Sequence, residues 1–309
     1  MNELVAQSAA MREAVRLASR VAETDANVLV TGESGAGKDA LALFIHRRSR
    51  RASGPFVKID CASLPRELLE AELFGYERGA FTGATQAKPG RLEAAHKGTL
   101  VLDEIAHLTT DAQAKLLRVI ERREFERLGG RRTVRVDARV IALTNVDLDD
   151  AVKRKAFRSD LFFRLNVVRI HVPPLRERRE DVTQLARQFL KTYAAKHGRA
   201  QRSLSREALA LLESYEWLGN VRELAHVLER AVIVSEGERI EAGDLPEAVR
   251  TAAAFASRRT RRPTLAELEA GYIVEVLTAT RGNKSAAARV LGISRKNLYE
   301  KIARYRLEV

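Results

Sequence analysis

Cysteine is nearly absent from this sequence, and long apolar runs are absent altogether. The single cysteine, Cys61, excludes a disulfide within the chain, and we expect it to be a small buried residue. No run approaches the roughly 18 apolar residues that a membrane-spanning helix needs, so we expect no membrane partner. The first residues lack the basic segment and apolar core of a signal peptide. Together these absences favour a protein of the reducing cytoplasm.

Acidic residues are also fewer than basic ones, most of all in the last fifth of the chain. The net charge is +13, and residues 251–309 hold 12 Lys and Arg against 5 Asp and Glu, a net charge of +7. Such an excess is typical of proteins with a polyanionic partner. The alternative is an arginine-rich surface that is merely solvated.

Apolar residues alternate between two patterns along the first half of the chain. Short apolar runs that predict buried strands lie at 27–32, 56–60, 99–104, 139–145 and 167–172. Helical spacing occurs between them, at 11–22, 41–48 and 109–121. Alternating strands and helices predict an α/β fold with a helix-covered parallel sheet. From residue 173 onward we find only helical patterns.

A glycine-rich segment follows the first predicted strand and opens a helix. It matches G-x-x-x-x-G-K, in which backbone N–H groups and the helix N-terminus surround phosphate oxygens. Lys38 is then placed to reach the β- and γ-phosphates of ATP. Asp39 takes the position at which Ser or Thr usually touches Mg²⁺, and its carboxylate can also hold the ion. The candidate nucleotide-binding residues of this segment are Gly32, Glu33, Ser34, Gly35, Ala36, Gly37, Lys38 and Asp39.

Polar side chains end two of the predicted strands. Asp103 closes a buried strand and is a candidate for the Mg²⁺ shell, while Glu104 beside it is a candidate catalytic base for the attacking water. Adjacent acids at a strand end also occur as plain helix caps. Asn145 ends another strand, where it can sense the γ-phosphate. ATP and Mg²⁺ are therefore the predicted cofactors.

A loop of small residues carries one aromatic side chain. Its glycines allow unusual backbone dihedral angles, and Phe81 has few neighbours in sequence to bury it. One interpretation is that Phe81 folds into the core, and the other is that it is exposed to grip a partner. The six residues of the loop are Gly79, Ala80, Phe81, Thr82, Gly83 and Ala84.

Residues 282–305 predict a helix, a turn and a second helix. Asn283 and Ser294 are candidate caps, and Gly292 lies at the turn. Leu298, Ile302 and Tyr305 form one apolar face of the second helix. Polar residues off that face suit a recognition helix in double-stranded DNA. The candidate DNA contacts are Arg295, Lys296, Asn297, Tyr299, Lys301 and Arg304.

Six segments, taken in order, resemble one family. They are GESGAGKD, ELFGYERGAFTGA, GTLVLDEI, FRSDLFFRL, PPLRERREDV and WLGNVREL. They look like the AAA+ ATPase module of bacterial sigma-54-dependent transcriptional activators, and the tail resembles the Fis-like domain that follows it. The resemblance implies four parts: an α/β ATPase core at 1–173, a helical lid at 174–246, a linker at 247–263 and a helix-turn-helix domain at 264–309.

The resemblance also implies a mechanism. ATP hydrolysis in a hexameric ring would remodel sigma-54 RNA polymerase through residues 79–84, with the tails paired as dimers on upstream DNA at the nucleoid. Arg158 and Arg164 match the arginine fingers, which reach a neighbouring subunit's nucleotide, and Arg222 matches the second sensor of the lid. The resemblance also implies a place in a two-component system. Because no receiver domain precedes residue 1, we expect either regulation by a separate protein or a longer parent chain.

Two positions depart from the family pattern. Leu218 replaces the usual Pro in WLGNVREL, and Asp60 replaces the Asn that restrains the catalytic glutamate in many members. Asp60 beside Glu104 would introduce like-charge repulsion. The rival function is a DNA-binding regulator in which the nucleotide site sets only the oligomeric state.

Overall fold

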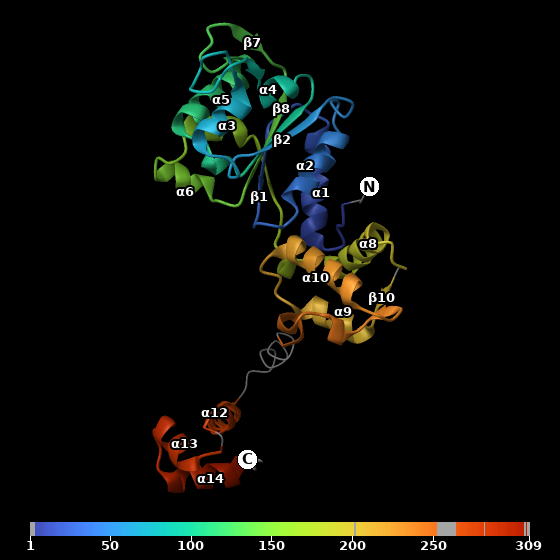
Figure 1. Cartoon of the computed structure of the whole chain (residues 1–309), viewed down its shortest axis with the longest axis vertical. Helices are drawn as coiled ribbons and strands as arrows, with labels where there is room; N and C mark the ends of the chain where they lie inside the picture. The colour runs from blue at the N-terminus through green and yellow to red at the C-terminus, as the bar shows by residue number, and fades with distance from the viewer. Residues whose placement is uncertain (1–3, 201, 252–263, 281, 306, 308–309) are drawn as a thin grey trace. The chain divides into compact units, whose positions relative to one another are not determined.

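The computed structural model describes residues 4–200, 202–251, 264–280, 282–305 and 307. The chain divides into two compact units, Met1–Pro246 and Glu247–Val309, and Figure 1 shows both. Most of the predicted linker, 252–263, lies outside the described residues. Among the described residues, no helix is long and apolar enough to cross a membrane.

A five-stranded parallel sheet forms the centre of the first unit, as the alternating pattern predicts. Its strand order is β2-β5-β8-β1-β9, with every neighbouring pair parallel. The strands are β1 (Val28–Thr31), β2 (Phe56–Asp60), β5 (Thr99–Asp103), β8 (Arg139–Thr144) and β9 (Val168–His171). Because the strands are parallel, the carboxyl ends of β1, β5 and β8 meet at one edge, where the phosphate-binding segment also begins.

Helices cover both faces of this sheet (Figure 1). Successive strand residues point to opposite faces, so Leu29 enters one core cluster while Val28 and Val30 enter the other. The cluster of Val28 is covered by α1 (Ala9–Ala22) and α2 (Lys38–Arg47), and that of Leu29 by α3, α5 and α7. The remaining helices of the core are α3 (Arg66–Phe74), α4 (Arg91–Ala94), η1 (Ile105–His107), α5 (Thr110–Arg122), α6 (Leu148–Lys153) and α7 (Ser159–Leu165).

Two short antiparallel hairpins project from this core, and sequence periodicity did not predict them. Strands β3 (Gly75–Tyr76) and β4 (Lys88–Pro89) close the base of the loop that contains residues 79–84. Strands β6 (Glu124–Glu126) and β7 (Thr133–Arg135) form the second hairpin, directly after α5. Segments of two or three residues are too short to display an alternating pattern.

The rest of the first unit is mostly helical. Its helices are η2 (Leu175–Glu177), α8 (Glu180–Lys196), α9 (Arg206–Ser214), α10 (Asn220–Val234) and η3 (Ala242–Asp244). The prediction of helices alone after residue 173 is wrong in one detail, because β10 (Ser203–Leu204) pairs with β11 (Arg239–Ile240). The only tryptophan of the chain, Trp217, is fully buried here, and its indole N–H donates to the Leu212 carbonyl at 2.8 Å.

In the second unit, residues 247–251 are helical, and three further helices lie among the described residues 264–305. They are α12 (Leu265–Ala279), α13 (Lys284–Val290) and α14 (Arg295–Tyr305). Both predicted caps are confirmed: the Asn283 side chain accepts from two backbone N–H groups, and the Ser294 hydroxyl accepts from the Asn297 N–H at 3.2 Å. Leu298 is fully buried, and Ile302 and Tyr305 pack beside it, as the apolar face of the helix predicts.

Candidate nucleotide site and interaction surfaces

The phosphate-binding segment joins β1 to α2 at the carboxyl edge of the sheet. Gly32, Gly35 and Gly37 all have positive φ angles, of 151°, 74° and 102°. A Cβ atom at Gly35 would lie 2.5 Å from the Gly219 carbonyl oxygen, so only glycine fits under the lid there. Lys38 begins α2, whose N-terminus faces a pocket of about 250 Å³. This loop therefore leaves backbone N–H groups free to surround phosphate oxygens.

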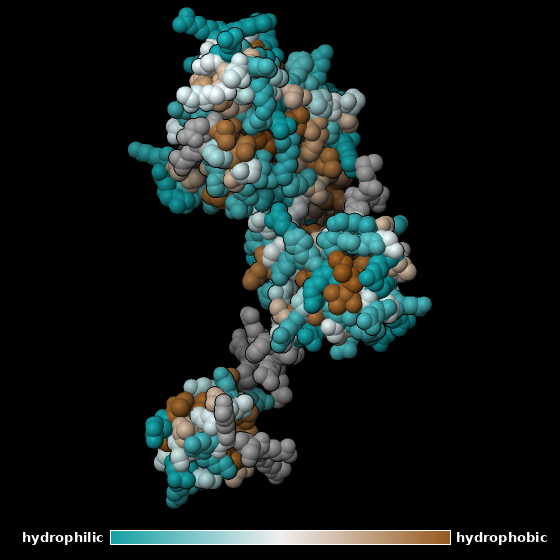
Figure 2. Space-filling model, in the orientation of Figure 1, coloured by the Kyte–Doolittle hydropathy of each residue, from teal (hydrophilic) through white to brown (hydrophobic). Residues whose placement is uncertain are grey.

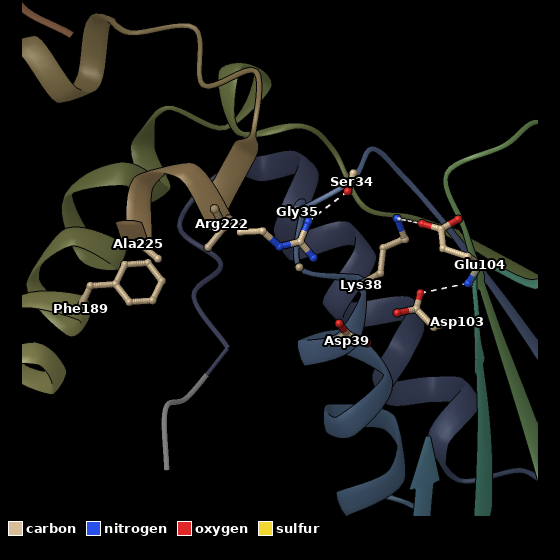
Figure 3. Close-up of a pocket in the computed structure, with 11 residues that line it drawn as sticks. Ser34, Gly35, Lys38, Asp39, Asp103, Glu104, Phe189, Arg222 and Ala225 are labelled. Carbon is tan, nitrogen blue, oxygen red and sulfur yellow. Dashed lines mark hydrogen bonds and ion pairs between the residues drawn. The ribbon is translucent and has the colours of Figure 1, made fainter. Parts of the chain in front are cut away.

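Lys38 and Glu104 face each other across this pocket (Figure 3). The Lys38 ammonium lies 3.8 Å from a Glu104 carboxylate oxygen and donates to the Gly32 carbonyl at 2.8 Å. Burial lowers the pKa of Lys38, and the charge of Glu104 partly opposes that shift. Glu104 itself has φ of 51°, a left-handed conformation that costs free energy for a residue with a Cβ atom. Such strain commonly occurs where a side chain is held for function.

The two predicted Mg²⁺ ligands converge on one point, which Lys58 occupies. The Lys58 ammonium lies 2.5 Å from an Asp39 oxygen and 2.7 Å from an Asp103 oxygen. Burial lowers the pKa of Lys58, but hydrogen bonds to Asp103 and Asp39 outweigh it and raise that pKa. Among the described residues, no group of three or more His, Cys, Asp and Glu can hold a metal ion. Two carboxylates and the phosphates of a nucleotide nevertheless match the oxygen ligands of Mg²⁺.

The lid closes the pocket from the opposite side. Arg222, in the first turn of α10, points into the pocket and donates to the Ser34 hydroxyl at 3.0 Å (Figure 3). Phe189 and Ala225 add apolar walls. Leu218, which replaces the usual Pro, is 79% exposed and precedes this turn without contributing to the pocket. Arg222 therefore reaches from the lid to the phosphate-binding segment.

A second contact between lid and phosphate loop centres on Glu33. Its carboxylate accepts two hydrogen bonds from the Arg176 guanidinium, at 2.8 and 2.5 Å, and one from the Asn220 amide at 3.1 Å. These bonds from Arg176 and Asn220 hold the pKa of Glu33 down, at about 2. Asn220 is fully buried, and its amide oxygen accepts from the Leu175 N–H at 2.7 Å. Glu33 therefore positions the lid as well as belonging to the phosphate loop.

Asn145 and Asp60 occupy positions that differ in part from the predictions. The backbone N–H of Asn145 donates to Glu104 at 3.2 Å, but Asn145 does not line the pocket. Asp60 accepts from the Ala62 N–H at 2.9 Å, within its own turn. Glu104 thus has Asn145 and Lys38 as its partners.

Both arginine-finger candidates lie outside the nucleotide pocket of their own chain. Arg158 directly precedes α7 and pairs with Asp160 at 2.7 Å, whereas Arg164 lies in the last turn and pairs with Glu121 at 2.9 Å. Neither residue lines the pocket. The two arginines therefore lie at opposite ends of α7.

The loop of residues 79–84 is anchored at its base. Gly79 and Gly83 have φ of 81° and 102°, and the Gly79 N–H donates to the Ala84 carbonyl at 2.9 Å. Phe81 is 42% exposed and belongs to neither core cluster. Its ring lies edge-on to that of Tyr76, with 4.9 Å between centroids. The interpretation that Phe81 fills the core is therefore wrong.

Most of the candidate DNA contacts in α14 are exposed. Arg295, Lys296, Asn297, Tyr299 and Arg304 all face solvent. Lys301 is the exception, because its ammonium pairs with Glu269 of α12 at 2.6 Å. The polar face of α14 therefore presents its N-terminal residues most openly, as base reading requires.

Sequence reasoning assigned no role to three residues of the nucleotide site. Lys58 lies in the middle of β2, and no local pattern shows that it reaches two acids from other elements. Arg176 and Asn220 belong to segments that resemble the family, yet only folding places them against Glu33. Cys61 is 98% removed from solvent, and burial raises the pKa of its thiol to about 12, which makes it an unreactive core residue.

Comparisons with known proteins agree along the chain. Residues 4–171 match the sigma-54 interaction domain, 176–262 an AAA+ ATPase lid domain, and 264–305 the bacterial regulatory proteins of the Fis family. Regulatory protein AtoC of Escherichia coli is 44% identical over 99% of this chain and 68% of the relative. FlbD of Caulobacter vibrioides is 44% identical over 98% of this chain and 70% of its own.

A solved structure supports the same conclusion. NtrX from Brucella abortus in complex with ATP has a TM-score of 0.75 and 35% identity, over 99% of this chain and 70% of that one. Its likeness extends through the ATPase core, the lid and the Fis-type domain. This chain belongs to the sigma-54-dependent transcriptional activators, as an AAA+ ATPase with a helix-turn-helix DNA-binding domain.

Proposed function

We propose that this activator hydrolyses ATP and uses the energy to remodel sigma-54 RNA polymerase through residues 79–84. The exposure of Phe81 carries the proposal, since 42% of an aromatic surface faces solvent on a loop whose base is held by hydrogen bonds. An exposed aromatic on an anchored loop suits a contact with a partner protein. The loop also lies outside the nucleotide pocket, so contact and hydrolysis can be separated by substitution.

A cleft supports coupling between the nucleotide site and this loop. Lys58 and Phe81 both line one cleft of about 530 Å³, and Lys58 also bridges Asp39 and Asp103. A divalent cation bound by those acids would neutralise phosphate charge, and it would displace the Lys58 ammonium toward the cleft. The contact of Phe81 with sigma-54 would then depend on which nucleotide is bound.

The residues of the pocket take distinct roles in this proposal. Lys38 holds the β- and γ-phosphates, Glu104 orients and polarises the attacking water, and Arg222 reports the γ-phosphate to the lid. Asp39 and Asp103 hold Mg²⁺. The positions of these side chains around one pocket support the assignment.

Assembly completes the site. Arg158 and Arg164 do not line the pocket of their own chain, which supports their contribution to a neighbouring subunit in a hexameric ring. The tail domains would pair as dimers on upstream DNA. The protein would then act at the nucleoid, as part of a two-component system. The rival is a DNA-binding regulator whose nucleotide site sets only the oligomeric state. An ATPase rate that fails to rise with protein concentration would favour that rival.

Loop substitutions test the proposal directly. We expect Thr82→Ala to fold, assemble and hydrolyse ATP, but to lose sigma-54 capture with a transition-state ATP mimic and to lose open-complex formation. Thr85→Ala is a matched control, because Thr85 is also exposed and lies one residue beyond the loop.

Replacing the aromatic residue of the loop provides a second test of the proposal. Phe81→Ala should lose the same two activities, whereas the Thr85→Ala control should retain them. Removing an exposed aromatic forfeits burial against a partner rather than burial in the core. Normal promoter opening by both Thr82→Ala and Phe81→Ala would overturn the assignment of this loop to sigma-54.

A further inference from the structure

Positive charge in the first unit is concentrated in one segment. Residues 1–246 hold 41 Lys and Arg against 35 Asp and Glu, a net charge of +6. Residues 115–135 alone hold eight cationic and three acidic side chains, a net charge of +5. The rest of the unit is nearly neutral, so the charge that would attract a polyanion to it is local to α5 and the β6–β7 hairpin.

The arginines of this segment divide into two groups. Arg127 pairs with Glu77 and Glu93, and Arg123 pairs with Asp137, so both have structural partners. Five others are exposed and have no ion pair among the described residues. We call these five the basic patch: Arg118, Arg122, Arg131, Arg132 and Arg135.

Helix α5 and the hairpin bring the basic patch together at one end of the unit. Arg118 and Arg122, one turn apart, line a cavity of about 340 Å³ whose other wall includes Gly129 and Thr133 of the hairpin. Figure 1 shows α5 and β7 at that end, and in Figure 2 hydrophilic side chains project from it. Like charges one helical turn apart repel each other, so an anion beside them would be stabilising.

The basic patch adjoins the loop that we assign to sigma-54. The Leu128 N–H donates to the Gly75 carbonyl at 2.9 Å, and the Glu77 N–H donates to the Leu128 carbonyl at 3.0 Å. A Cβ atom at Gly129 would lie 2.9 Å from Ala80, so hairpin and loop are in direct contact. Whatever binds the loop therefore comes close to the patch.

The chemistry of the patch favours nucleic acid over protein. No large hydrophobic side chain among residues 115–135 is exposed, whereas protein interfaces depend on buried apolar anchors. Arginine forks match phosphate oxygens in geometry and charge. We propose that the basic patch binds the phosphate backbone of promoter DNA, as a second DNA contact separate from the tail. The promoter as its setting rests on the proposed function, but the DNA contact itself does not.

Salt-dependent binding tests this contact in the full chain. The tail is silenced by Arg295→Gln with Arg304→Gln, and anisotropy is measured with a 30-base-pair duplex that carries no upstream site. Adding Arg131→Gln, Arg132→Gln and Arg135→Gln should weaken binding at least tenfold. It should also flatten the slope of log K against log salt by about 2 to 3, since each phosphate contact contributes about 0.9.

A matched control distinguishes the effect of removing charge from the basic patch from the effect of lowering the net charge of the protein. Arg187, Arg206 and Arg239 are exposed arginines of the lid, and changing all three to Gln removes the same charge. That control should leave binding and its salt slope unchanged, and both triple variants should keep their ATPase rate. Equal losses in the two triple variants would overturn the proposal, as would unchanged binding in the patch variant. Loss of sigma-54 capture with unchanged DNA binding would instead identify the patch as a protein contact and also overturn it.

Discussion

Glu33 and Arg176 join the phosphate loop to the lid, and their coupling can be measured. The pKa of Glu33 falls from an ordinary 4.5 to about 2, chiefly through the Arg176 hydrogen bonds. At 1.36 kcal/mol per unit this shift sets an upper limit of roughly 3 kcal/mol. The Glu33 side chain is 42% exposed, so solvent screening reduces the expected coupling to about 1–2 kcal/mol.

A double-mutant cycle measures the coupling free energy between Glu33 and Arg176. Glu33→Gln, Arg176→Gln and the double variant are unfolded in urea, with the fluorescence of the single tryptophan, Trp217, reporting on the lid. We expect a coupling of about 1–2 kcal/mol at pH 7. The pair of Glu13 and Arg16 serves as control, because both side chains are more than 60% exposed and solvent screening should make their coupling clearly smaller.

The sign of the pH dependence follows from the direction of the shift. The folded-state pKa of Glu33 is depressed, so its contribution to stability is fully present above about pH 4.5 and is lost as pH falls toward about 2. Because the same lid segment carries Arg222, Glu33→Gln should also weaken ATP binding by about 5- to 30-fold, the equivalent of 1–2 kcal/mol. A coupling no larger than that of the control pair would refute the role of Glu33 as a link to the lid.

Three further outcomes are expected. Lys58→Met removes the ammonium between two carboxylates, so the Mg²⁺ concentration that supports nucleotide binding, followed by calorimetry, should change severalfold; an unchanged requirement contradicts the metal assignment. Arg164→Ala should bind ATP yet lose roughly 10³ in turnover, and mixing it with Glu104→Gln should restore some hydrolysis; no recovery in assembled mixtures argues against a shared site. Asn297→Ala should relax sequence preference, whereas Arg304→Ala should weaken all sequences alike and flatten the salt dependence; equal affinity of the unmodified chain for random and selected duplexes removes the base-reading role.

Local patterns in the sequence were enough to predict the five strands of the sheet and the approximate bounds of α1, α2 and α5. Buried strands such as β5 and β8 appear as continuous apolar runs, because both faces of a parallel sheet are covered. The phosphate loop could also be predicted from the sequence, because its glycines and its lysine lie close together in the chain and their spacing defines the phosphate-binding motif. The caps at Asn283 and Ser294 also depend on contacts within three residues.

Contacts between distant segments were decided only by the tertiary structure. Lys58 reaches acids 19 and 45 positions away, and Glu33 meets Arg176 across 143 positions, distances over which no local pattern acts. The same is true of the hairpin that brings the basic patch beside the loop of Phe81. Sequence alone determined which residue types could bind a nucleotide. The packing of strands, hairpin and lid decided which of these residues come into contact. Contacts between side chains depend on distances between distant segments, and only the folded chain sets those distances.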